Sequence, residues 1–472
     1  MLLGLQRPPR DRQALFDGSG ARWWTYGDLA DEVGRASEAI TSTKALAFCF
    51  MANDVGSIAG YLAVLDRGHA AVLLDPALPP APALTLFERY APEFVIASAS
   101  GALPPIPDGE YDAASCPSPS VRIWRRRAAA AEDVHPDLAV LLSTSGSTGS
   151  PKFVRLSRQN VASNAVAIVQ SLGVGADDCA VTTLPLHYAY GLSVLNSHLA
   201  AGARLALTSE SVVAPRLWAL MREAGCTSLA GVPYTYQILN RIGLDHFEVP
   251  SLNTLTQAGG RLDDALILKF ERAMRARGGR FVVMYGQTEA TARMTYLPPE
   301  YLPEKVGAVG IPIPRGTIGI DGGAGAAAAG QQGEVVYSGP NVMLGYADCR
   351  RHLSLGDELG GTLRTGDVGY LDRDGLLRIV GRNSRMAKMF GLRLNLDEVE
   401  EQLRRFGPTA VVSGDNKILI FCEEGDEPEF ARRRVELAAR LRIHHSALEF
   451  CRVSALPRTA SGKTDYHRLQ RA

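Results

Sequence analysis

The feature that most constrains the fold of this chain is an apolar run that ends in a loop of hydroxyl residues and glycines. The run is Leu138–Leu142, and Ser143-Thr-Ser-Gly-Ser-Thr-Gly-Ser-Pro-Lys152 follows it directly. A short apolar run bounded by a turn signal is typical of a buried strand. In the loop, Gly146 and Gly149 let backbone N–H groups turn toward an anion, and Lys152 adds a positive charge. The pattern predicts a loop that binds a polyphosphate, with a flexible Ser/Gly surface loop as the alternative.

Single residues exclude the loop of a P-loop NTPase. A Walker A loop needs glycine directly before its lysine, and Pro151 occupies that place before Lys152. The C-terminal Ser461-Gly-Lys-Thr464 looks like a Walker ending, but its upstream glycine would fall on Pro457. A different class of phosphate loop is therefore needed.

Read with the rest of the chain, the loop resembles that of the adenylate-forming superfamily. This family includes acyl- and aryl-CoA synthetases, nonribosomal peptide adenylation domains and firefly luciferase. Further family motifs follow in the family's order: Tyr285-Gly-Gln-Thr-Glu289, Gly333-Glu-Val-Val-Tyr-Ser-Gly-Pro-Asn-Val-Met-Leu-Gly-Tyr346, Thr365-Gly-Asp-Val-Gly-Tyr-Leu371, Gly381-Arg382 leading to Gly391, and Pro457-Arg-Thr-Ala-Ser-Gly-Lys463. The resemblance extends from about Trp24 to the last residues, so that it covers nearly the whole chain.

The expected fold is α/β with two domains. A chain of 472 residues is too long for one core, and strand-like runs alternate with helical ones, which is typical of a parallel sheet covered by helices. The resemblance implies a large N-terminal domain, residues 1–383, with two helix-covered sheets and a small β-barrel-like subdomain. A small, mobile α+β domain, residues 384–472, would carry Lys463. We expect residues 101–136 to be a connecting stretch and Gly322–Gly330 to be a hairpin loop.

The resemblance also implies the chemistry. A carboxylate of an acid attacks the α-phosphorus of ATP, pyrophosphate leaves, and the acyl- or aryl-adenylate passes to a thiol of CoA or of a carrier protein's phosphopantetheine. Neither step needs a protein nucleophile, so catalysis is positioning and charge neutralisation. Glu289 is by resemblance the ligand of Mg²⁺, with Thr288 beside the α-phosphate, and Lys463 neutralises the charge that develops between the acid and ATP.

The remaining roles are carried over by position in the family pattern. Tyr285 would lie against adenine, and Asp367 and Arg382 would bind the ribose. The ATP-binding residues implied are Thr144, Ser145, Gly146, Ser147, Thr148, Gly149, Lys152, Gly259, Gly260, Tyr285, Gly286, Asp367 and Arg382. The acid pocket would include His187, Tyr188, Gly231, Tyr234 and Ala258. Ser384 stands at the hinge, and Lys388 and Gly391 match the loop that lines the pantetheine tunnel.

The sequence narrows the class of acid substrate without identifying the acid. Members that activate α-amino acids place an aspartate after the Pro-rich strand end, and Leu184-Pro-Leu-His-Tyr-Ala-Tyr-Gly191 has no acidic residue. Tyr234 and Tyr236 suggest a bounded site for a small or aromatic acid. The acceptor stays open between CoA and a carrier protein, because Arg432-Arg-Arg434 could meet the phosphates of the one or an acidic surface of the other. An adenylate-former with a non-thiol acceptor and a silent binding homologue are the alternatives.

Composition excludes several other classes. Lys+Arg and Asp+Glu are 50 each, so no overall field favours nucleic acid or an anionic membrane. Seven cysteines, scattered without Cys-x-x-Cys spacing, argue against a disulfide framework and a zinc site. The apolar start is too short for a signal peptide, and no run reaches membrane length. We expect a cytoplasmic enzyme that binds neither nucleic acid nor membrane.

Overall fold

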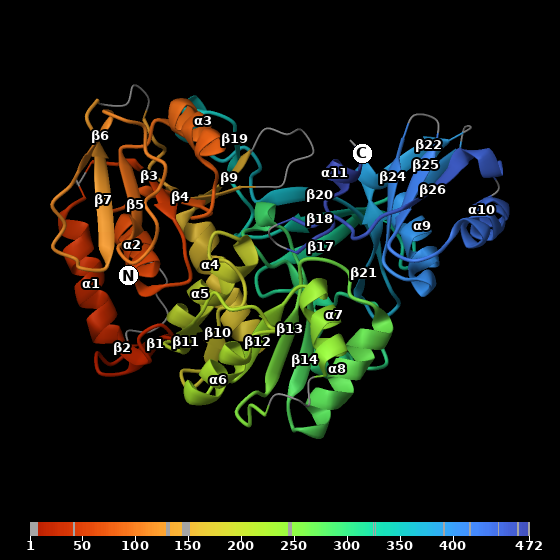
Figure 1. Cartoon of the computed structure of the whole chain (residues 1–472), viewed down its shortest axis with the longest axis horizontal. Coiled ribbons are helices and arrows are strands. Elements are labelled where there is room, and N and C mark those ends of the chain that lie inside the picture. The colour runs from red at the N-terminus through yellow and green to blue at the C-terminus, as the bar shows by residue number, and fades with distance from the viewer. Residues whose placement is uncertain are drawn as a thin grey trace. The chain divides into compact units, whose positions relative to one another are not determined.

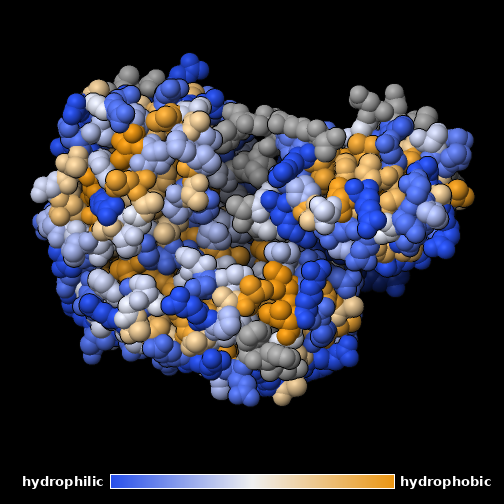
Figure 2. Space-filling model, viewed as in Figure 1, coloured by the Kyte–Doolittle hydropathy of each residue, from blue (hydrophilic) through white to orange (hydrophobic). Residues whose placement is uncertain are grey.

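The chain divides into two compact units. Unit 1 contains Met1–Val306, Pro312–Thr317 and Ser338–Leu363, and unit 2 contains Gly307–Ile311, Ile318–Tyr337 and Arg364–Ala472. The structure, a computed structural model, describes residues 8–40, 43–128, 133–143, 152–243, 248–323, 325, 327–389, 392–414, 417–441, 443–459 and 462–470. Figure 1 shows the elements in chain order, and Figure 2 shows hydrophilic and hydrophobic residues interspersed over the visible face.

The first sheet of unit 1 is parallel in its centre. In spatial order its strands are β19 (Gly345–Ala347), β9 (Phe153–Ser157), β8 (Leu138–Ser143), β4 (Ala70–Leu74), β3 (Leu46–Phe50), β5 (Phe94–Ser98), β7 (Val121–Arg126) and β6 (Tyr111–Ala113). The neighbours β8, β4, β3 and β5 are parallel, whereas β19, β9, β7 and β6 join by antiparallel pairing. The central strands are buried along their whole length, as apolar runs such as Ala70–Leu74 predict.

The second sheet of unit 1 has the same design. Its strands run in the order β15 (Thr295–Tyr296), β14 (Arg280–Tyr285), β13 (Thr254–Gln257), β12 (Ser228–Gly231), β10 (Cys179–Val181), β11 (Arg204–Leu207), β1 (Gln13–Asp17) and β2 (Arg22–Thr25). From β14 to β1 all neighbours are parallel, and β15 and β2 pair antiparallel. The short strand β16 (Ile311–Pro312) follows later in the chain.

Helices cover both sheets. They are α1 (Tyr26–Glu38), α2 (Val55–Asp66), α3 (Pro80–Tyr90), α4 (Arg158–Leu172), α5 (Ala189–Ala200), α6 (Pro215–Glu223), α7 (Pro233–Ile242) and α8 (Asp264–Ala276), with 3₁₀ turns η2 (Thr288–Ala290), η3 (Pro299–Tyr301) and η4 (Arg350–Ser354). One core cluster joins β3, β4 and β8 to β10 and β11 through α1, α2, α4 and α5. Of these helices, α2 and α5 are buried along nearly their whole length, whereas α1 and α4 each keep an exposed face. Figure 1 shows α4 and α5 side by side.

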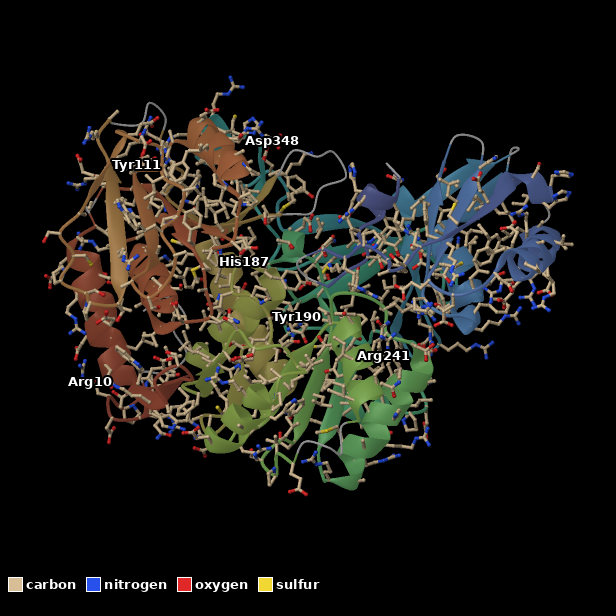
Figure 3. All side chains as sticks on the ribbon, viewed as in Figure 1. Arg10, Tyr111, His187, Tyr190, Arg241 and Asp348 are labelled. Carbon is tan, nitrogen blue, oxygen red and sulfur yellow. The ribbon has the colours of Figure 1, made fainter. Side chains whose placement is uncertain are left out.

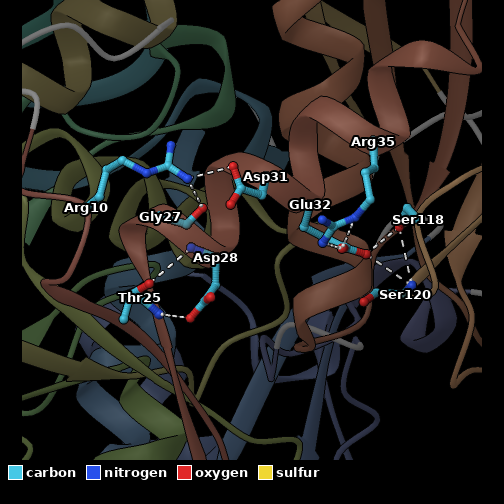
Figure 4. A network of polar contacts seen from close by, with 9 residues as sticks. All are labelled: Arg10, Thr25, Gly27, Asp28, Asp31, Glu32, Arg35, Ser118 and Ser120. Atoms are coloured by element: carbon cyan, nitrogen blue, oxygen red, sulfur yellow. Dashed lines mark hydrogen bonds and ion pairs between the residues drawn. The ribbon is translucent and has the colours of Figure 1, made fainter.

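Polar side chains fix the start and the middle of α1. Thr25 and Asp28 form a capping box, in which the Thr25 side chain accepts from the Asp28 N–H and the Asp28 carboxylate accepts from the Thr25 N–H. One turn later the fully buried Glu32 accepts from Arg35, Ser118 and the Ser120 N–H (Figure 4). The helix is thereby tied to the segment before β7.

Unit 2 contains three small sheets. The first is β17 (Thr317–Asp321), β18 (Gly333–Ser338), β20 (Thr362–Leu371) and β21 (Leu377–Arg382), the second is β22 (Met386–Met389) with β23 (Leu392–Asn395), and the third is β24 (Thr409–Ser413), β25 (Ile418–Cys422) and β26 (Leu448–Arg452). The helices are α9 (Leu396–Leu403), α10 (Glu427–Leu441) and α11 (Tyr466–Leu469), with the 3₁₀ turns η5 (Asn383–Arg385), η6 (Arg404–Phe406) and η7 (His445–Ala447). A separate core packs α9 and α10 against β25 and β26.

The α/β class with a large N-terminal part and a small α+β C-terminal part is confirmed. The expected small β subdomain is the four-stranded sheet of unit 2, and the described residues of Gly322–Gly330 connect its neighbouring strands β17 and β18. The interpretation of residues 101–136 as a mere connection is wrong, because β6 and β7 extend the first sheet there. Val121 and Ile123 are buried while Arg122 and Trp124 are not, and this period of two in the sequence was the signal for a strand.

Candidate functional site

Four adjacent strands of the second sheet end in predicted site residues. β10 leads to His187 and Tyr188, β12 ends at Gly231, β13 leads to Ala258, and β14 ends at Tyr285. Because these strands are parallel neighbours, their carboxyl ends lie along the same edge of the sheet. The structure thus brings the predicted acid pocket and the predicted adenine contacts to one edge of unit 1.

The glycines at this edge are needed for close approach. A Cβ on Gly286 would lie 1.9 Å from the carbonyl oxygen of Ala292. A Cβ on Gly231 would lie 2.9 Å from the Tyr236 ring, and one on Gly260 would meet Pro233 at 3.2 Å. Gly259 has a φ of +84°, in the region that favours glycine. The turns after β12, β13 and β14 therefore depend on residues without side chains.

Glu289 and Lys152 both face Tyr346. The Tyr346 hydroxyl donates to Oε1 of Glu289 over 2.9 Å, and Nζ of Lys152 lies 5.4 Å from the centre of the Tyr346 ring. The backbone N–H of Met343 donates to the Glu289 carbonyl over 2.9 Å. Burial and the Glu289 carboxylate raise the pKa of Tyr346, so that its hydroxyl stays a donor. In the sequence Tyr346 is only the last residue of a motif, whereas in the structure it lies between two predicted ATP-site residues.

Glu289 fits the requirements of a Mg²⁺ ligand in one respect. Tyr346 donates to Oε1 of Glu289. The second oxygen, Oε2, has neither a hydrogen bond nor an ion pair within the described ranges. Among the described residues, no group of three or more His, Cys, Asp or Glu side chains is arranged to hold a metal ion. A single carboxylate suits Mg²⁺ that is held chiefly by phosphate oxygens and waters, rather than by a protein cage.

An apolar cluster lies at the predicted acid pocket. It contains Leu184, Tyr190, Ala230, Val232, Ala258, Val282 and Met284, with Tyr188 partly buried against it. The Tyr190 hydroxyl lies 3.0 Å from the Thr256 carbonyl and 2.9 Å from its hydroxyl. Burial raises the pKa of Tyr188 to about 12, so that it is neutral near pH 7. Two of the five predicted pocket residues, Tyr188 and Ala258, are thus in one cluster.

His187 is turned toward a different neighbourhood. Its Nε2 lies 3.7 Å from the Asp75 carboxylate, and its Nδ1 lies 3.5 Å from the carbonyl of Met51. Burial lowers the pKa of His187, although Asp75 opposes the shift, so the ring is neutral at pH 7. Figure 3 labels His187 near the start of α5, with Tyr190 on that helix.

The two tyrosines of α7 behave differently. Tyr234 is 39% exposed. Tyr236 is fully buried, donates its hydroxyl to the Thr256 carbonyl over 2.7 Å, and packs edge-on against Phe270 and Phe281. Tyr236 therefore lies in the core beneath α7 and α8, which is one of the placements that the sequence leaves open for it.

In unit 2, Asp367 and Arg382 face each other across a strand pair. They are partners in the register of β20 and β21, and Arg382 Nε lies 2.9 Å from Oδ1 of the Asp367 side chain, which is 3% exposed. The Thr365 hydroxyl accepts from the Asp367 N–H over 3.1 Å and donates to the Val335 carbonyl over 2.8 Å. The Thr-Gly-Asp motif thus presents a buried acid beside the half-exposed Arg382 of β21.

Lys463 lies on a tight turn of unit 2 with its side chain exposed. The Thr459 N–H donates to the Lys463 carbonyl over 2.8 Å, and the Thr459 hydroxyl accepts from the Lys463 N–H over 3.2 Å. Gly462 has a φ of +77° and donates back to the Thr459 carbonyl. Thr459, to which the sequence analysis gave no role, is therefore the residue that closes this turn.

Some predicted residues lie outside the described part of the chain. They are Thr144, Ser145, Gly146, Ser147, Thr148 and Gly149 of the phosphate loop, and Gly391. The backbone of Ser384 and Lys388 is described, in η5 and β22, but their side chains are not. Of Arg432-Arg-Arg434, Arg432 is exposed, whereas Arg433 is buried and pairs with Glu429, and Arg434 lies 3.8 Å from Glu427.

No helix in the described ranges combines the length and apolarity that a membrane crossing requires. A family model described as AMP-binding enzyme matches residues 4–347. Among curated proteins, the oxalate–CoA ligase of Arabidopsis thaliana is 33% identical over 275 residues, which is 57% of this chain and 53% of the relative. The 2-succinylbenzoate–CoA ligase of Bacillus licheniformis is 30% identical over 354 residues, which is 72% of this chain and 71% of the relative. In the first of these matches the chain spans about half the relative's length.

Solved structures share the fold over nearly the whole chain. The o-succinylbenzoate CoA synthetase of Bacillus subtilis in complex with an acyl-adenylate intermediate has a TM-score of 0.76 at 23% identity, covering 98% of this chain and 96% of that one. ATP-bound MatB from Rhodopseudomonas palustris has a TM-score of 0.78 at 22% identity, covering 99% and 97%. The likeness is one of architecture, with a large N-terminal and a small C-terminal part.

Proposed function

Because the chain belongs to the family of AMP-binding enzymes, we propose that it is an acid–thiol ligase that forms AMP. In this proposal a carboxylate oxygen of the acid attacks the α-phosphorus of ATP, and the bond from phosphorus to the bridging oxygen of pyrophosphate breaks. The resulting acyl- or aryl-adenylate then passes to the thiol of CoA or of a separate carrier protein's phosphopantetheine, and AMP leaves. The CoA ligases among the relatives support this reaction class.

The observation that carries the proposal is the arrangement of Lys152, Tyr346 and Glu289. The end of the predicted phosphate loop and the predicted Mg²⁺ ligand are far apart in sequence, yet both face the same phenol ring. A polyphosphate needs positive charge on one side and a metal-binding carboxylate on the other. Two unrelated surface residues would have no reason to converge on one tyrosine.

Mg²⁺, when bound, would lower the negative charge of the phosphates that the attacking carboxylate meets. Glu289 would hold it through Oε2, while Tyr346 keeps the carboxylate turned by its hydrogen bond to Oε1. In unit 2, Asp367 would accept from the ribose hydroxyls and Arg382 would donate to the same sugar. Lys463 would approach the reacting groups as a single ammonium on the turn that Thr459 closes.

In this proposal the N-terminal domain ends at residue 383 and the C-terminal domain begins at Ser384. Arg382 pairs with Asp367 of β20, whereas Arg385 pairs with Asp397 and Glu400 and stacks on the Tyr466 ring at 3.8 Å. Ser384 stands between these two anchors and would be the hinge. Lys388 and Gly391 would then line the path of the pantetheine arm, and both CoA and a carrier protein are acceptors of the right chemistry.

Acid-dependent ATP–pyrophosphate exchange tests the proposal. A panel of fatty, aryl, dicarboxylic and amino acids should give exchange with one acid class, and Lys463→Ala should lower it by about 10²-fold or more, because a charge-neutralising group is lost. Lys417→Ala is the matched control, since Lys417 is another lysine of unit 2 that pairs only with Glu449 on the surface. Absence of exchange with every acid, or equal exchange in both variants, would refute the proposed reaction.

A further inference from the structure

A guanidinium is buried in unit 1 without a carboxylate partner among the residues that the structure describes. Arg293 is 3% exposed, and its guanidinium lies over the Tyr190 ring, 4.4 Å from the ring centre. Nη2 donates to the Ser193 hydroxyl over 3.3 Å, and Nε has no acceptor. No acidic side chain of the described residues contributes to its electrostatic environment, in which only Tyr190 and Tyr188 act. An unpaired buried charge is costly, so an arrangement of this kind calls for an explanation.

The other buried arginines show what this chain does with a structural guanidinium. Among the described residues three more are buried, and each has a carboxylate partner. Arg155 pairs with Glu358, Arg350 with Glu93, and Arg433 with Glu429. Arg293 differs from all three in having only a ring and a hydroxyl. A partner supplied by a ligand would make it like the others.

The backbone is held in a strained form that orients Arg293. Thr291, two residues earlier, has a φ of +65°, which a β-branched residue rarely adopts. Its N–H donates to Thr288 and its hydroxyl to the Asn341 carbonyl. The Asn341 amide donates to the carbonyls of Ala290 and Arg293, each over 2.9 Å. These bonds fix the turn between the Glu289 motif and Arg293, so the inward placement of the guanidinium is specified rather than accidental.

The guanidinium borders the predicted acid pocket. Tyr190, on which it stacks, belongs to the apolar cluster that also contains Ala258 and borders Tyr188. A Cβ on Gly286 would approach the Arg293 Cα to 2.9 Å, so the Arg293 backbone packs directly beside the residue that follows Tyr285. Arg293 therefore has its backbone beside the predicted nucleotide motif and its guanidinium over the apolar cluster of the same unit.

We propose that Arg293 binds a second carboxylate of the acid, and that the substrates are dicarboxylic acids activated at one end only. This inference rests on the proposed function, since it names the substrate class of that site. One carboxylate would be adenylated as described above, while the other would remain unchanged and take the open Nε donor of Arg293. Arginine suits this task because its planar fork can hold a carboxylate by two parallel bonds. A monocarboxylic acid of the same length would leave the guanidinium unpaired.

Matched pairs of acids test the inference. ATP–pyrophosphate exchange should be measured for succinate against butyrate, glutarate against valerate, and terephthalate against benzoate. The wild type should favour the diacid of at least one pair by about 10²-fold or more in kcat/KM, because a buried polar group left unpaired costs affinity strongly. In Arg293→Met the preference should fall toward one, and Arg293→Lys should keep part of it. Arg241→Met, which removes an exposed arginine of α7, should keep the wild-type preference.

A second measurement separates the two failures. Thermal unfolding of the wild type with each acid of a pair, in the presence of a non-hydrolysable ATP analogue, reports binding without chemistry. One outcome is that no exchange occurs, while diacids alone raise the unfolding temperature and Arg293→Met abolishes this rise. That outcome would refute the proposed reaction but support the binding of diacids by Arg293. Equal exchange and equal shifts for diacids and monoacids would overturn it, as would an Arg293→Met variant that weakens both members of a pair alike. If Arg293→Met fails to fold, Arg293→Lys and the wild-type ratio decide in the same way.

Discussion

Two segments of unit 1 hold charged side chains in opposite ways. On β9, Arg155 is fully buried and all its donor groups are used: Nε bonds the Tyr346 carbonyl, Nη1 the carbonyls of Leu355 and Gly356, and Nη2 the Leu344 carbonyl and Glu358. In the segment Thr288–Arg293, Glu289 keeps Oε2 open and Arg293 keeps Nε open. Neither has a described partner of opposite charge.

The difference separates structure from function in residues of the same kind. The buried pair of Arg155 ties β9 to the segment that carries Tyr346 and Glu358, so its hydrogen bonds are satisfied within the fold. The open groups after β14 lie where ATP and an acid are expected. Charges that a fold leaves unsatisfied, at a strained turn that other residues stabilise, are the ones to test as ligand contacts.

The largest expected effect is on Arg155. Arg155→Met should lower the free energy of unfolding by about 3–5 kcal/mol, because Glu358 and several carbonyls lose their donor. Arg293→Met should lower it by about 1 kcal/mol or less, since no carboxylate is stranded. Urea denaturation of both variants measures this contrast, and equal losses would break the comparison.

A substitution at Glu289 should reduce activity strongly and stability little, the reverse of what is expected at Arg155. Glu289→Gln should reduce ATP–pyrophosphate exchange by about 10²-fold, roughly 2.7 kcal/mol, because a neutral amide is a poor ligand of Mg²⁺. The melting temperature should stay near that of the wild type, since the amide oxygen still accepts from Tyr346. Tyr346→Phe, which removes only the hydrogen bond to Glu289, should reduce exchange less. A Glu289→Gln variant that unfolds would show that Glu289, like Arg155, serves the structure.

A substitution at Asn341 tests whether its hydrogen bonds hold the turn between Glu289 and Arg293 in place. Asn341→Ala should destabilise the protein by about 1–3 kcal/mol, because the buried carbonyls of Ala290 and Arg293 lose a donor. Asn164→Ala removes one bond to Arg293 and should cost less. Wild-type selectivity among acids in Asn341→Ala would show that Arg293 holds its place without this support.

The smallest expected effect is that of pH. The folded pKa of His187 is lowered by burial, so the folded protein binds fewer protons than the unfolded chain below about pH 6.5. Stability should therefore decline as pH falls through that range, and His187→Gln should decline less. The two arginines stay protonated throughout, so the Arg155–Arg293 contrast should be the same at pH 5.5 and pH 8. Thermal melts at a series of pH values decide this.

Much of the fold could be predicted because its strands are unusually readable. Runs such as Ala70–Leu74 are buried on both faces and therefore continuous, and helix α6 begins at Pro215 as its sequence indicates. The motifs also pointed to candidate site residues in each of the two units. The roles themselves stay predictions for Glu289, Asp367, Arg382 and Lys463.

What the sequence could not give depends on contacts between distant residues. Tyr346 reaches Glu289 across 57 positions of sequence, and nothing local separates the paired Arg155 from the unpaired Arg293. Tyr234 and Tyr236 stand two residues apart, and only packing against Phe270 and Phe281 shows that the second is core. Burial and pairing of charges are properties of the assembled sheet rather than of a motif.

The two ends of the first sheet have a consequence for how the protein behaves in a crowded solution. The terminal strands β19 and β6 have three residues each. Arg127, just beyond β7, donates hydrogen bonds of 2.7 to 3.1 Å to the Asp112 carboxylate of β6. Short edge strands offer few backbone groups on which another chain could add a strand, and the ion pair adds charge at the β6 end. The first sheet, whose central parallel strands are buried, is thereby protected at both of its ends from the addition of a strand of another chain.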